Sequence, residues 1–308
     1  MACPILFEAL PPQVESTDEQ WQDHLDLLDP LRRAGLAAIN VPEIVNGHYT
    51  TVEPRAFAAA LQRRLGTKVI LNRITVHHTL PQLRGWVAES RLGHGIDTFV
   101  LVGGESSKQT YPGATVLDAL HGLRPPVEAA KGALGVITIP TRRRPVGDEP
   151  ERLLAKAAAG ARFAISQILC EPGAAVRLQK DLAEAAQSSG RAAPQLFWSL
   201  APVARPRDLD FLKWLGVDIP PAVEGELRGA ATPAARLEAS VRLNEGIARD
   251  LLAAAERDGA PAPGFCVEHV MLSNIEAGIA LVDRIKDVGR GFRGSARAAV
   301  PALAASTW

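Results

Sequence analysis

Short hydrophobic runs alternate with longer amphipathic stretches from one end of the chain to the other. Each short run is rich in β-favouring residues and leads through a polar loop into an alanine- and leucine-rich stretch with helical periodicity. The predicted strands are residues 5–10, 36–41, 68–74, 97–102, 134–139, 162–169, 195–200 and 264–270. The predicted helices are residues 18–34, 55–65, 81–92, 115–123, 149–159, 174–187, 236–257 and about 274–286.

Eight strand-then-helix units in about 290 residues predict a (β/α)8 TIM barrel, an α/β fold. A doubly wound sheet is the rival fold, but it usually carries a glycine-rich dinucleotide turn, and neither GxGxxG nor GxxxxGK[ST] is present. We expect one domain over residues 1–308, with a loosely packed tail after about residue 289. The segment 225–233 is the candidate for a longer connection before the eighth strand.

Residue types at the edges of the amphipathic stretches indicate where the helices begin and end. Thr17 and Asp18 are predicted N-caps, because short polar side chains accept hydrogen bonds from the first free backbone N–H groups. Gly35, Gly160 and Gly190 follow helical stretches and tolerate the positive φ of a helix C-terminus. These signals support the helical interpretation of the long stretches.

Composition and charge narrow the class of protein. Hydrophobic residues make up 47% and charged residues 22%, which is enough to bury a sizeable core. The 34 basic and 34 acidic residues balance, and this argues against nucleic-acid binding. The hydrophobic runs are shorter than a membrane helix needs, and the first residues carry no secretory signal, so we expect a cytoplasmic protein. Three distant cysteines support neither a disulfide framework nor a metal site.

Polar residues at the ends of the predicted strands form the candidate site, because the loops after the strands of such a barrel converge on one mouth. Glu8 is the leading candidate, since it lies in the apolar segment 7–12, and burial would raise its pKa and suit a general acid. Polar residues at strand ends also cap helices, so each of the others has a structural alternative. They are Asn40, Glu43, Glu53, Asn72, Arg73, Thr75, His77, His78, Gly103, Gly104, Glu105, Thr138, Thr141, Arg142, Arg143, Arg144, Ser166, Gln167, Ser199, Glu268 and His269.

Other chemistries have weaker support in the sequence. His77 and His78 have no third ligand at metal-binding spacing, and hydrolase motifs such as GxSxG and HExxH are absent. No lysine at a strand end suggests a Schiff-base aldolase. The basic triplet 142–144 is either a solvated loop or a contact for a phosphate or carboxylate.

Four segments in consistent order resemble the methylenetetrahydrofolate reductases, which are (β/α)8 enzymes. Phe-Glu-Ala-Leu-Pro-Pro at 7–12 resembles the family's Phe-Glu-Phe-Phe-Pro-Pro, and Val-Gly-Gly-Glu at 102–105 stands where the family has Leu-Arg-Gly-Asp. Lys-Ala-Ala-Ala-Gly-Ala at 156–161, followed by Ile-Ser-Gln at 165–167, matches Lys-x-x-Ala-Gly-Ala and Ile-Thr-Gln. His-Val-Met-Leu-Ser-Asn at 269–274 resembles His-Phe-Tyr-Thr-Leu-Asn. The resemblance covers nearly the whole chain, and the order and spacing of the segments carry it.

The resemblance implies reduction of 5,10-methylenetetrahydrofolate to 5-methyltetrahydrofolate. Glu8 falls on the family's general acid, Glu105 on an aspartate beside the flavin and pterin rings, and Gln167 on a glutamine that binds the pterin. Ser199 and His269 are the further substrate-binding candidates. The candidate cofactor-binding positions are Asn72, Gly103, Gly104, Thr138, Arg143 and Lys156.

Departures from the family pattern bear on the cofactor. Gly103 stands where the family has an arginine at the flavin, and Asn72 and Arg143 each stand where it has a histidine. Lys156 matches the lysine of the family. The segment 104–113 resembles a divergent branch in which hydride passes directly from NADH to the folate, and in that branch Glu53 matches a second implicated acid. The resemblance thus implies NAD(P)H, with NADH favoured, and leaves FAD as the alternative. A non-catalytic folate-binding or partner subunit is the competing function, and the oligomeric state, including a homo-oligomer, stays open.

Overall fold

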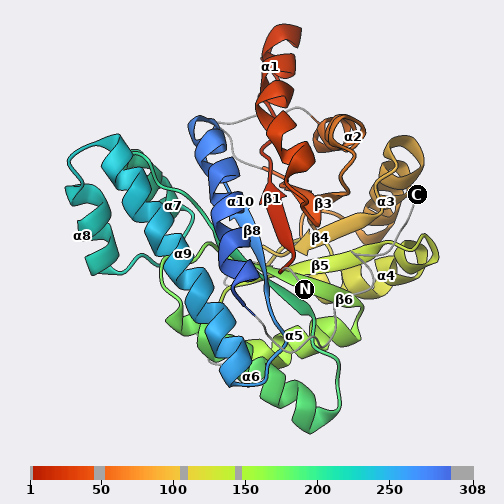
Figure 1. Cartoon of the computed structure of the whole chain (residues 1–308). Coiled ribbons are helices and arrows are strands. Elements are labelled where there is room, and N and C mark those ends of the chain that lie inside the picture. Colours follow the sequence, from red (N-terminus) through yellow and green to blue (C-terminus); the bar gives the residue numbers. More distant parts are fainter. Residues whose placement is uncertain (1–2, 45–52, 105–109, 143–147, 293–308) are drawn as a thin grey trace.

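The computed structural model describes residues 3–44, 53–104, 110–142 and 148–292. Eight parallel strands, each paired with the next and the last with the first, close into a barrel (Figure 1). The strands are β1 Ile5–Glu8, β2 Ala38–Val41, β3 Val69–Ile74, β4 Thr98–Val102, β5 Ala133–Thr138, β6 Ala161–Ser166, β7 Gln195–Leu200 and β8 Gly264–Glu268. The predicted (β/α)8 barrel is confirmed.

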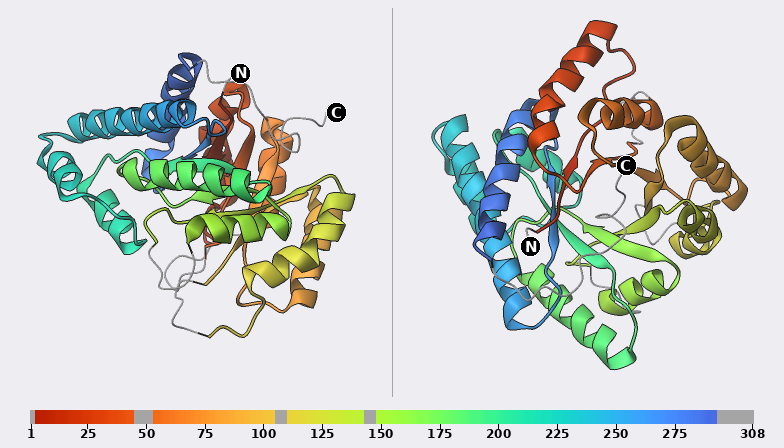
Figure 2. Two further views of the ribbon diagram at one scale, coloured as in Figure 1. Left: turned by 90° about the horizontal axis from the view of Figure 1, so that it is seen from below. Right: turned by 45° about the vertical axis from the view of Figure 1, so that its right-hand side comes forward.

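Helices surround the barrel, as the two views of Figure 2 show. They are α1 Asp18–Leu28, α2 Pro54–Leu65, α3 Leu80–His94, α4 Val116–Ala129, α5 Glu149–Ala158, α6 Gly173–Ser189, α7 Pro206–Trp214, α8 Pro221–Gly229, α9 Pro233–Arg257 and α10 Ile275–Arg290, with short 3-10 turns at Asp29–Arg33 and Leu272–Asn274. Thr17 caps α1 through a capping box, and Gly190 ends α6 in the left-handed region, as predicted. Asp18 is the first residue of α1, so its predicted N-cap role is wrong.

The connection between β7 and α9 differs most from the prediction. The segment 206–229 forms two helices, α7 and α8, where only a longer connection at 225–233 was expected. These helices lie beside α9 on one side of the barrel (Figures 1 and 2). They cover a separate hydrophobic cluster that includes Val203, Leu209, Leu212 and Val270. Short amphipathic helices of this kind form because tertiary packing stabilises them.

Several strands end earlier than the hydrophobic pattern predicts; β6, for example, ends at Ser166 and not at residue 169. β1 ends at Glu8 and β8 at Glu268, whereas the apolar runs continue to residues 10 and 270. Val270 has a φ of 62°, and the Met271 N–H donates to the His269 carbonyl at 2.6 Å, which forms a tight three-residue turn. Positive φ is strained for a β-branched residue, so this turn stops the strand by backbone geometry that hydrophobicity does not reveal.

Side chains alternate between the interior of the barrel and the helical shell. The interior cluster contains Leu6, Ala38, Ile70, Val100, Ala133, Phe163, Ile165, Phe197 and Cys266. Neighbouring strand residues such as Phe7, Phe99 and Trp198 pack outward against the helices. Gly135 lacks a side chain for a steric reason, because a Cβ there would lie 2.3 Å from the Phe163 ring. The barrel is therefore a filled core, and ligands can reach its mouth but not its interior.

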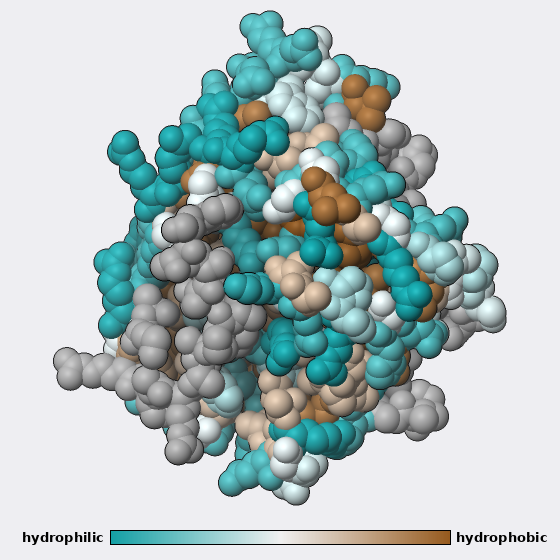
Figure 3. All heavy atoms as spheres, turned by 90° about the vertical axis from the view of Figure 1, so that its right-hand side faces the viewer, coloured by the Kyte–Doolittle hydropathy of each residue, from teal (hydrophilic) through white to brown (hydrophobic). Residues whose placement is uncertain are grey.

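One face of the outer surface is drawn in Figure 3. The face drawn in Figure 3 is mostly hydrophilic, with hydrophobic side chains singly or in small groups. Among the residues that the structure describes, no helix combines the length and apolar character that crossing a membrane requires.

Candidate functional site

A ring of inward-facing residues lies one step above the interior cluster, at the carboxyl ends of the strands. Each member stands two positions after an interior residue and therefore shares its face of the barrel. We call this ring the mouth layer; its members are Glu8, Asn40, Asn72, Val102, Ser199 and Glu268. All except Val102 are polar and come from β7, β8, β1, β2 and β3, so one side of the mouth is polar.

Glu8 and Glu268 are direct neighbours in the mouth layer. They are register partners across the β1–β8 pair, and each is the last residue of its strand. Both are partly exposed, while the residues before them are buried. Both side chains can therefore contact a ligand in the mouth, and both lie above the apolar interior of the barrel.

Burial disfavours a negative charge on either of these carboxyl groups. Desolvation raises the pKa of Glu8 to about 7, opposed by a hydrogen bond of 2.8 Å that Asn40 Nδ2 donates to Glu8 Oε2. Desolvation, together with the charge of Glu8, raises the pKa of Glu268 well above its ordinary value. A carboxyl group that titrates near neutral pH is suited to general acid catalysis. The role of Glu8 as a general acid stays a prediction.

Two buried amide oxygens of the mouth layer, Asn40 Oδ1 and Asn72 Oδ1, lack hydrogen-bond partners among the described residues. Each amide stands two residues after an interior residue, on β2 and β3 respectively. Ser199 lies fully buried on β7, and its hydroxyl interacts with Glu268. Unsatisfied buried polar atoms are costly, so their concentration in one ring marks a polar site built for further donors. Ser199, predicted to bind substrate, is covered and lies next to Glu268.

His269 follows Glu268 but faces away from the barrel interior. Its ring stacks on Phe7 with centroids 5.8 Å apart, and it is 1% exposed. Its Nε2 accepts from the Leu10 N–H at 3.3 Å, and its Nδ1 lies 3.0 Å from the Met271 carbonyl, an arrangement that assigns the Nδ1–H tautomer. Both ring nitrogens thus face protein groups, and the predicted substrate contact of His269 stays a prediction.

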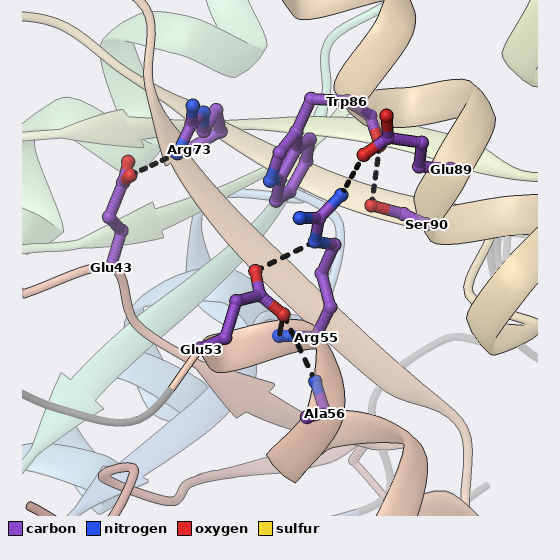
Figure 4. A network of polar contacts seen from close by, with 8 residues as sticks. All are labelled: Glu43, Glu53, Arg55, Ala56, Arg73, Trp86, Glu89 and Ser90. Atoms are coloured by element: carbon purple, nitrogen blue, oxygen red, sulfur yellow. Dashed lines mark hydrogen bonds and ion pairs between the residues drawn. The ribbon is translucent and has the colours of Figure 1, made fainter. Parts of the chain in front are cut away.

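A second polar network joins residues that follow β2, the end of β3 and the helices α2 and α3 (Figure 4). Glu43 pairs with Arg73 and accepts from the Ile74 N–H at 2.6 Å. The guanidinium of Arg73 lies 5.0 Å from the centroid of Trp86, and that of Arg55 lies 5.8 Å from it. These contacts fix the end of β3 and the start of α2.

Glu53, the predicted second acid, belongs to this network. It caps α2, with Oε2 accepting from the Arg55 N–H at 3.0 Å and the Ala56 N–H at 3.2 Å. Its Oε1 accepts from Arg55 Nε at 2.7 Å (Figure 4). Arg55 also bonds Glu89 at 2.6 Å. Both oxygens of Glu53 thus have local partners, and its catalytic role stays a prediction.

The candidates at β4 directly follow Val102, its last residue. Gly104 is needed for packing, because a Cβ would lie 2.3 Å from the Tyr111 ring, which meets His77 at 5.7 Å between centroids. Gly103 has ordinary space around it. Glu105 and Arg143 lie outside the described residues.

Thr138 and Lys156 connect β5 to its own helix. Thr138 Oγ1 donates to Glu149 Oε1 at 2.9 Å, and Glu149 also pairs with Arg152 at 3.0 Å. Lys156 is buried and donates to the Ile137 carbonyl at 3.0 Å. Both predicted cofactor contacts are directed at the protein between β5 and α5.

Gln167 follows β6 and reaches across to the inserted helices. Its Nε2 donates to the Leu215 carbonyl at 3.0 Å, and its Oε1 accepts from the Ile168 N–H at 3.2 Å. It lines a small cavity with Thr141, Cys170 and Asp218. Gln167 is therefore at the mouth, on the side opposite β2.

Two polar members of the mouth layer, Asn40 and Glu268, have no catalytic or binding role in the prediction from sequence, which places them only at strand ends. The signal that could have found them is position: each stands two residues after an inward apolar residue, as Glu8 does. Across the described residues, no cluster of three His, Cys, Asp or Glu side chains is arranged for a metal ion.

Comparison with known proteins finds no matching family model and no matching curated protein. Among solved structures, the chain is similar to an uncharacterized protein from Clostridium thermocellum that binds two copies of 5-methyl-5,6,7,8-tetrahydrofolic acid, with TM-score 0.77 and 24% identity over 93% of this chain and 96% of that one. An aldo-keto reductase of the silkworm Bombyx mori has TM-score 0.49 and 11% identity, covering 95% of this chain and 85% of that one. The first likeness shows that the two chains share the barrel fold.

Proposed function

We propose that this protein reduces 5,10-methylenetetrahydrofolate to 5-methyltetrahydrofolate with hydride from NAD(P)H. The observation that carries the proposal is the Glu8 carboxyl at the mouth, whose pKa is raised to about 7. The motif resemblance assigns the same residue to the family's general acid. The solved structure from C. thermocellum adds support, because its ligand is the product of the proposed reaction.

The chemistry requires one proton and one hydride. Because burial raises its pKa, Glu8 can hold a proton close to neutral pH. Its proton passes to N10 of the substrate, the bond between N10 and the methylene carbon breaks, and an N5 iminium forms. Hydride from NAD(P)H adds to that methylene carbon and gives the N5-methyl group, which leaves Glu8 as a carboxylate and the cofactor as NAD(P)+.

The mouth layer suits a flat ring with polar edges. Glu8, Asn40 and Asn72 supply hydrogen-bonding groups on one side of the mouth. The Gln167 amide is bonded to Leu215 and Ile168, so a pterin contact would require it to exchange one of these bonds. Val102 offers an apolar contact for a ring face. In the proposed complex the pterin lies over this ring with its bridge nitrogen toward Glu8.

Direct transfer from NAD(P)H agrees better with the described residues than a bound flavin does. Lys156 is the basic position retained from the family pattern, but it is buried and bonded to the Ile137 carbonyl. Thr138 is 1% exposed and bonded to Glu149. These side chains do not fit a flavin phosphate site, and we derive no step through FAD.

Turnover by the purified full-length chain tests the proposal. We expect NADH oxidation that depends on 5,10-methylenetetrahydrofolate and yields 5-methyltetrahydrofolate, identified by mass spectrometry. Failure with both NADH and NADPH would overturn the reductase proposal. Calorimetry then identifies the competing function, a folate-binding subunit, as binding of 5-methyltetrahydrofolate without binding of either dinucleotide.

A further inference from the structure

A second carboxyl group, that of Glu268, stands next to the general acid proposed above. Glu8 and Glu268 are register partners at the ends of adjacent parallel strands. Both point to the inner face, because Leu6 and Cys266, two residues earlier, belong to the interior cluster. Adjacent strands lie about 4.8 Å apart, so the two carboxyl groups are within reach of each other.

The groups around this pair offer it little compensation for negative charge. Asn40 on β2 donates one hydrogen bond to Glu8, and the Ser199 hydroxyl on β7 hydrogen-bonds Glu268; each bond lowers the pKa of its carboxyl group by less than burial raises it. Below them the Cys266 thiol is fully buried, and the charges of both carboxyl groups add to burial in raising its pKa. In the described part of the chain, no lysine or arginine contributes to the pKa shift of either carboxyl. Two full negative charges are therefore strongly disfavoured here.

We propose that Glu268 shares a proton with Glu8. Glu268 stays protonated, and it donates a hydrogen bond to the carboxylate that Glu8 becomes after protonating the substrate. The inference rests on the proposed function for the identity of the substrate. The pair begins with two protons, gives one to N10, and retains one between its oxygens. Solvent returns the missing proton after the product leaves. Two carboxyl groups that share a proton are a known way to set the acidity of one of them.

Burial and charge agree with this assignment. Desolvation and the charge of Glu8 both raise the pKa of Glu268, opposed by a hydrogen bond with Ser199, so loss of the proton from Glu268 is disfavoured while Glu8 is charged. His269 cannot take this place, because its ring nitrogens face Leu10 and Met271. Glu268 is thus the group placed to stabilise the Glu8 carboxylate.

Carboxyl titration tests the pair without reference to turnover. We expect 13C NMR of the full chain with labelled glutamate to show two coupled titrations, both above the ordinary range of a glutamate. In Glu8→Gln the remaining Glu268 titration moves to lower pH, because the neighbouring charge is lost. A Glu268 that titrates near its ordinary value of about 4.3 in the wild type would overturn the inference.

Kinetics separate the donor role of Glu268 from simple packing. Glu268→Gln keeps an N–H donor of similar size. We therefore expect kcat within about 3-fold of wild type, and the fall of kcat at high pH should still be centred near pH 7. Glu268→Leu has no donor, so we expect kcat to drop about 10-fold or more and its fall at high pH to be centred at a higher pH. Equal losses in the two variants would contradict the donor role.

Two further readouts keep the outcomes distinct. If Glu268→Leu does not fold, by circular dichroism and thermal melting, the NMR titrations of wild type and Glu8→Gln decide the inference. Two coupled titrations in a wild-type chain without turnover would refute the proposed reductase while leaving the proton-sharing pair intact.

Discussion

The backbone N–H of Leu10 donates a hydrogen bond of 3.3 Å to Nε2 of His269, and this bond ties the loop after β1 to the end of β8. The Leu10 carbonyl in turn lies 3.0 Å from Nε2 of His24. Two buried histidines thus hold one residue of the loop that follows Glu8, the proposed general acid. Both have a lowered pKa because burial disfavours the imidazolium.

Acid should destabilise the protein through His269. Its pKa is lowered to about 4 from the ordinary 6.5, so its contribution to stability is full above pH 6.5 and is lost as pH falls toward 4. We expect the free energy of unfolding to fall by about 2 kcal/mol between pH 7 and pH 5 on account of this residue. Urea denaturation of wild type and His269→Gln at both pH values measures it as the difference. An equal fall in both proteins would show that His269 is not the cause.

Glu8→Gln should reduce kcat about 100-fold or more, because the amide cannot supply the proton to N10. In the wild type, kcat should fall as pH rises through about 7, since Glu8 must be protonated to act. Stopped-flow or steady-state NADH oxidation across pH measures both effects. Glu15→Gln, an exposed glutamate in the loop after β1, is the matched control and should keep wild-type rates. A Glu8→Gln variant with normal turnover would remove Glu8 from the reaction.

Asn40 should set the pH at which Glu8 acts. Its hydrogen bond to Glu8 favours the carboxylate and lowers the pKa, so Asn40→Leu should raise that pKa. We expect the alkaline limb of the kcat profile to move up by about one pH unit. Asn72→Leu is the matched control on β3. Asn72 is not among the groups that shift the pKa of Glu8, so in this variant kcat should still fall near pH 7. Identical limbs in the two variants would exclude this role for Asn40.

The purified protein should show no flavin absorption and should use NADH directly. This follows from the internal bonds of Lys156 and Thr138. Lys156→Met should lower the melting temperature, because a buried donor to the Ile137 carbonyl is lost, and should leave the ultraviolet–visible spectrum unchanged. Flavin bands at near-stoichiometric occupancy, diminished in Lys156→Met, would restore the flavin alternative.

Glu53→Asn tests whether the second acid is catalytic or structural. Asparagine keeps an N-cap acceptor for α2 but removes the carboxylate and its pairing with Arg55. Because both carboxylate oxygens already have local partners, we expect kcat within about 3-fold of wild type and a loss of stability below about 1 kcal/mol. If turnover instead drops about 10-fold or more while the melting temperature is unchanged, the catalytic role that the resemblance implies is supported.

The barrel was predictable because its signal is repeated eight times. Each hydrophobic run marks a strand, and alternation along it separates inward residues such as Leu6 from outward ones such as Phe7. The same alternation placed Glu8 at the inner end of β1. Local sequence thus contained the residue on which the proposed chemistry depends.

Contacts between residues far apart in the sequence could not be predicted from the hydrophobic pattern. The pairing of Glu8 with Glu268 exists because β8 closes onto β1, and closure brings together residues 260 positions apart. The turn at Val270 and the helices α7 and α8 depend on backbone strain and on tertiary packing. The hydrophobic periodicity of the sequence predicts neither the turn nor the two helices.

The turn at Val270 has a consequence for stabilising this protein by engineering. If β8 continued regularly past Glu268, Val270 would lie on the inner face directly above the carboxyl pair. The positive φ instead directs it into the cluster beneath α7 and α8. This backbone strain, on the order of 1 to 3 kcal/mol, keeps the mouth open, so a redesign that replaced the turn with regular strand would gain stability and close off the site.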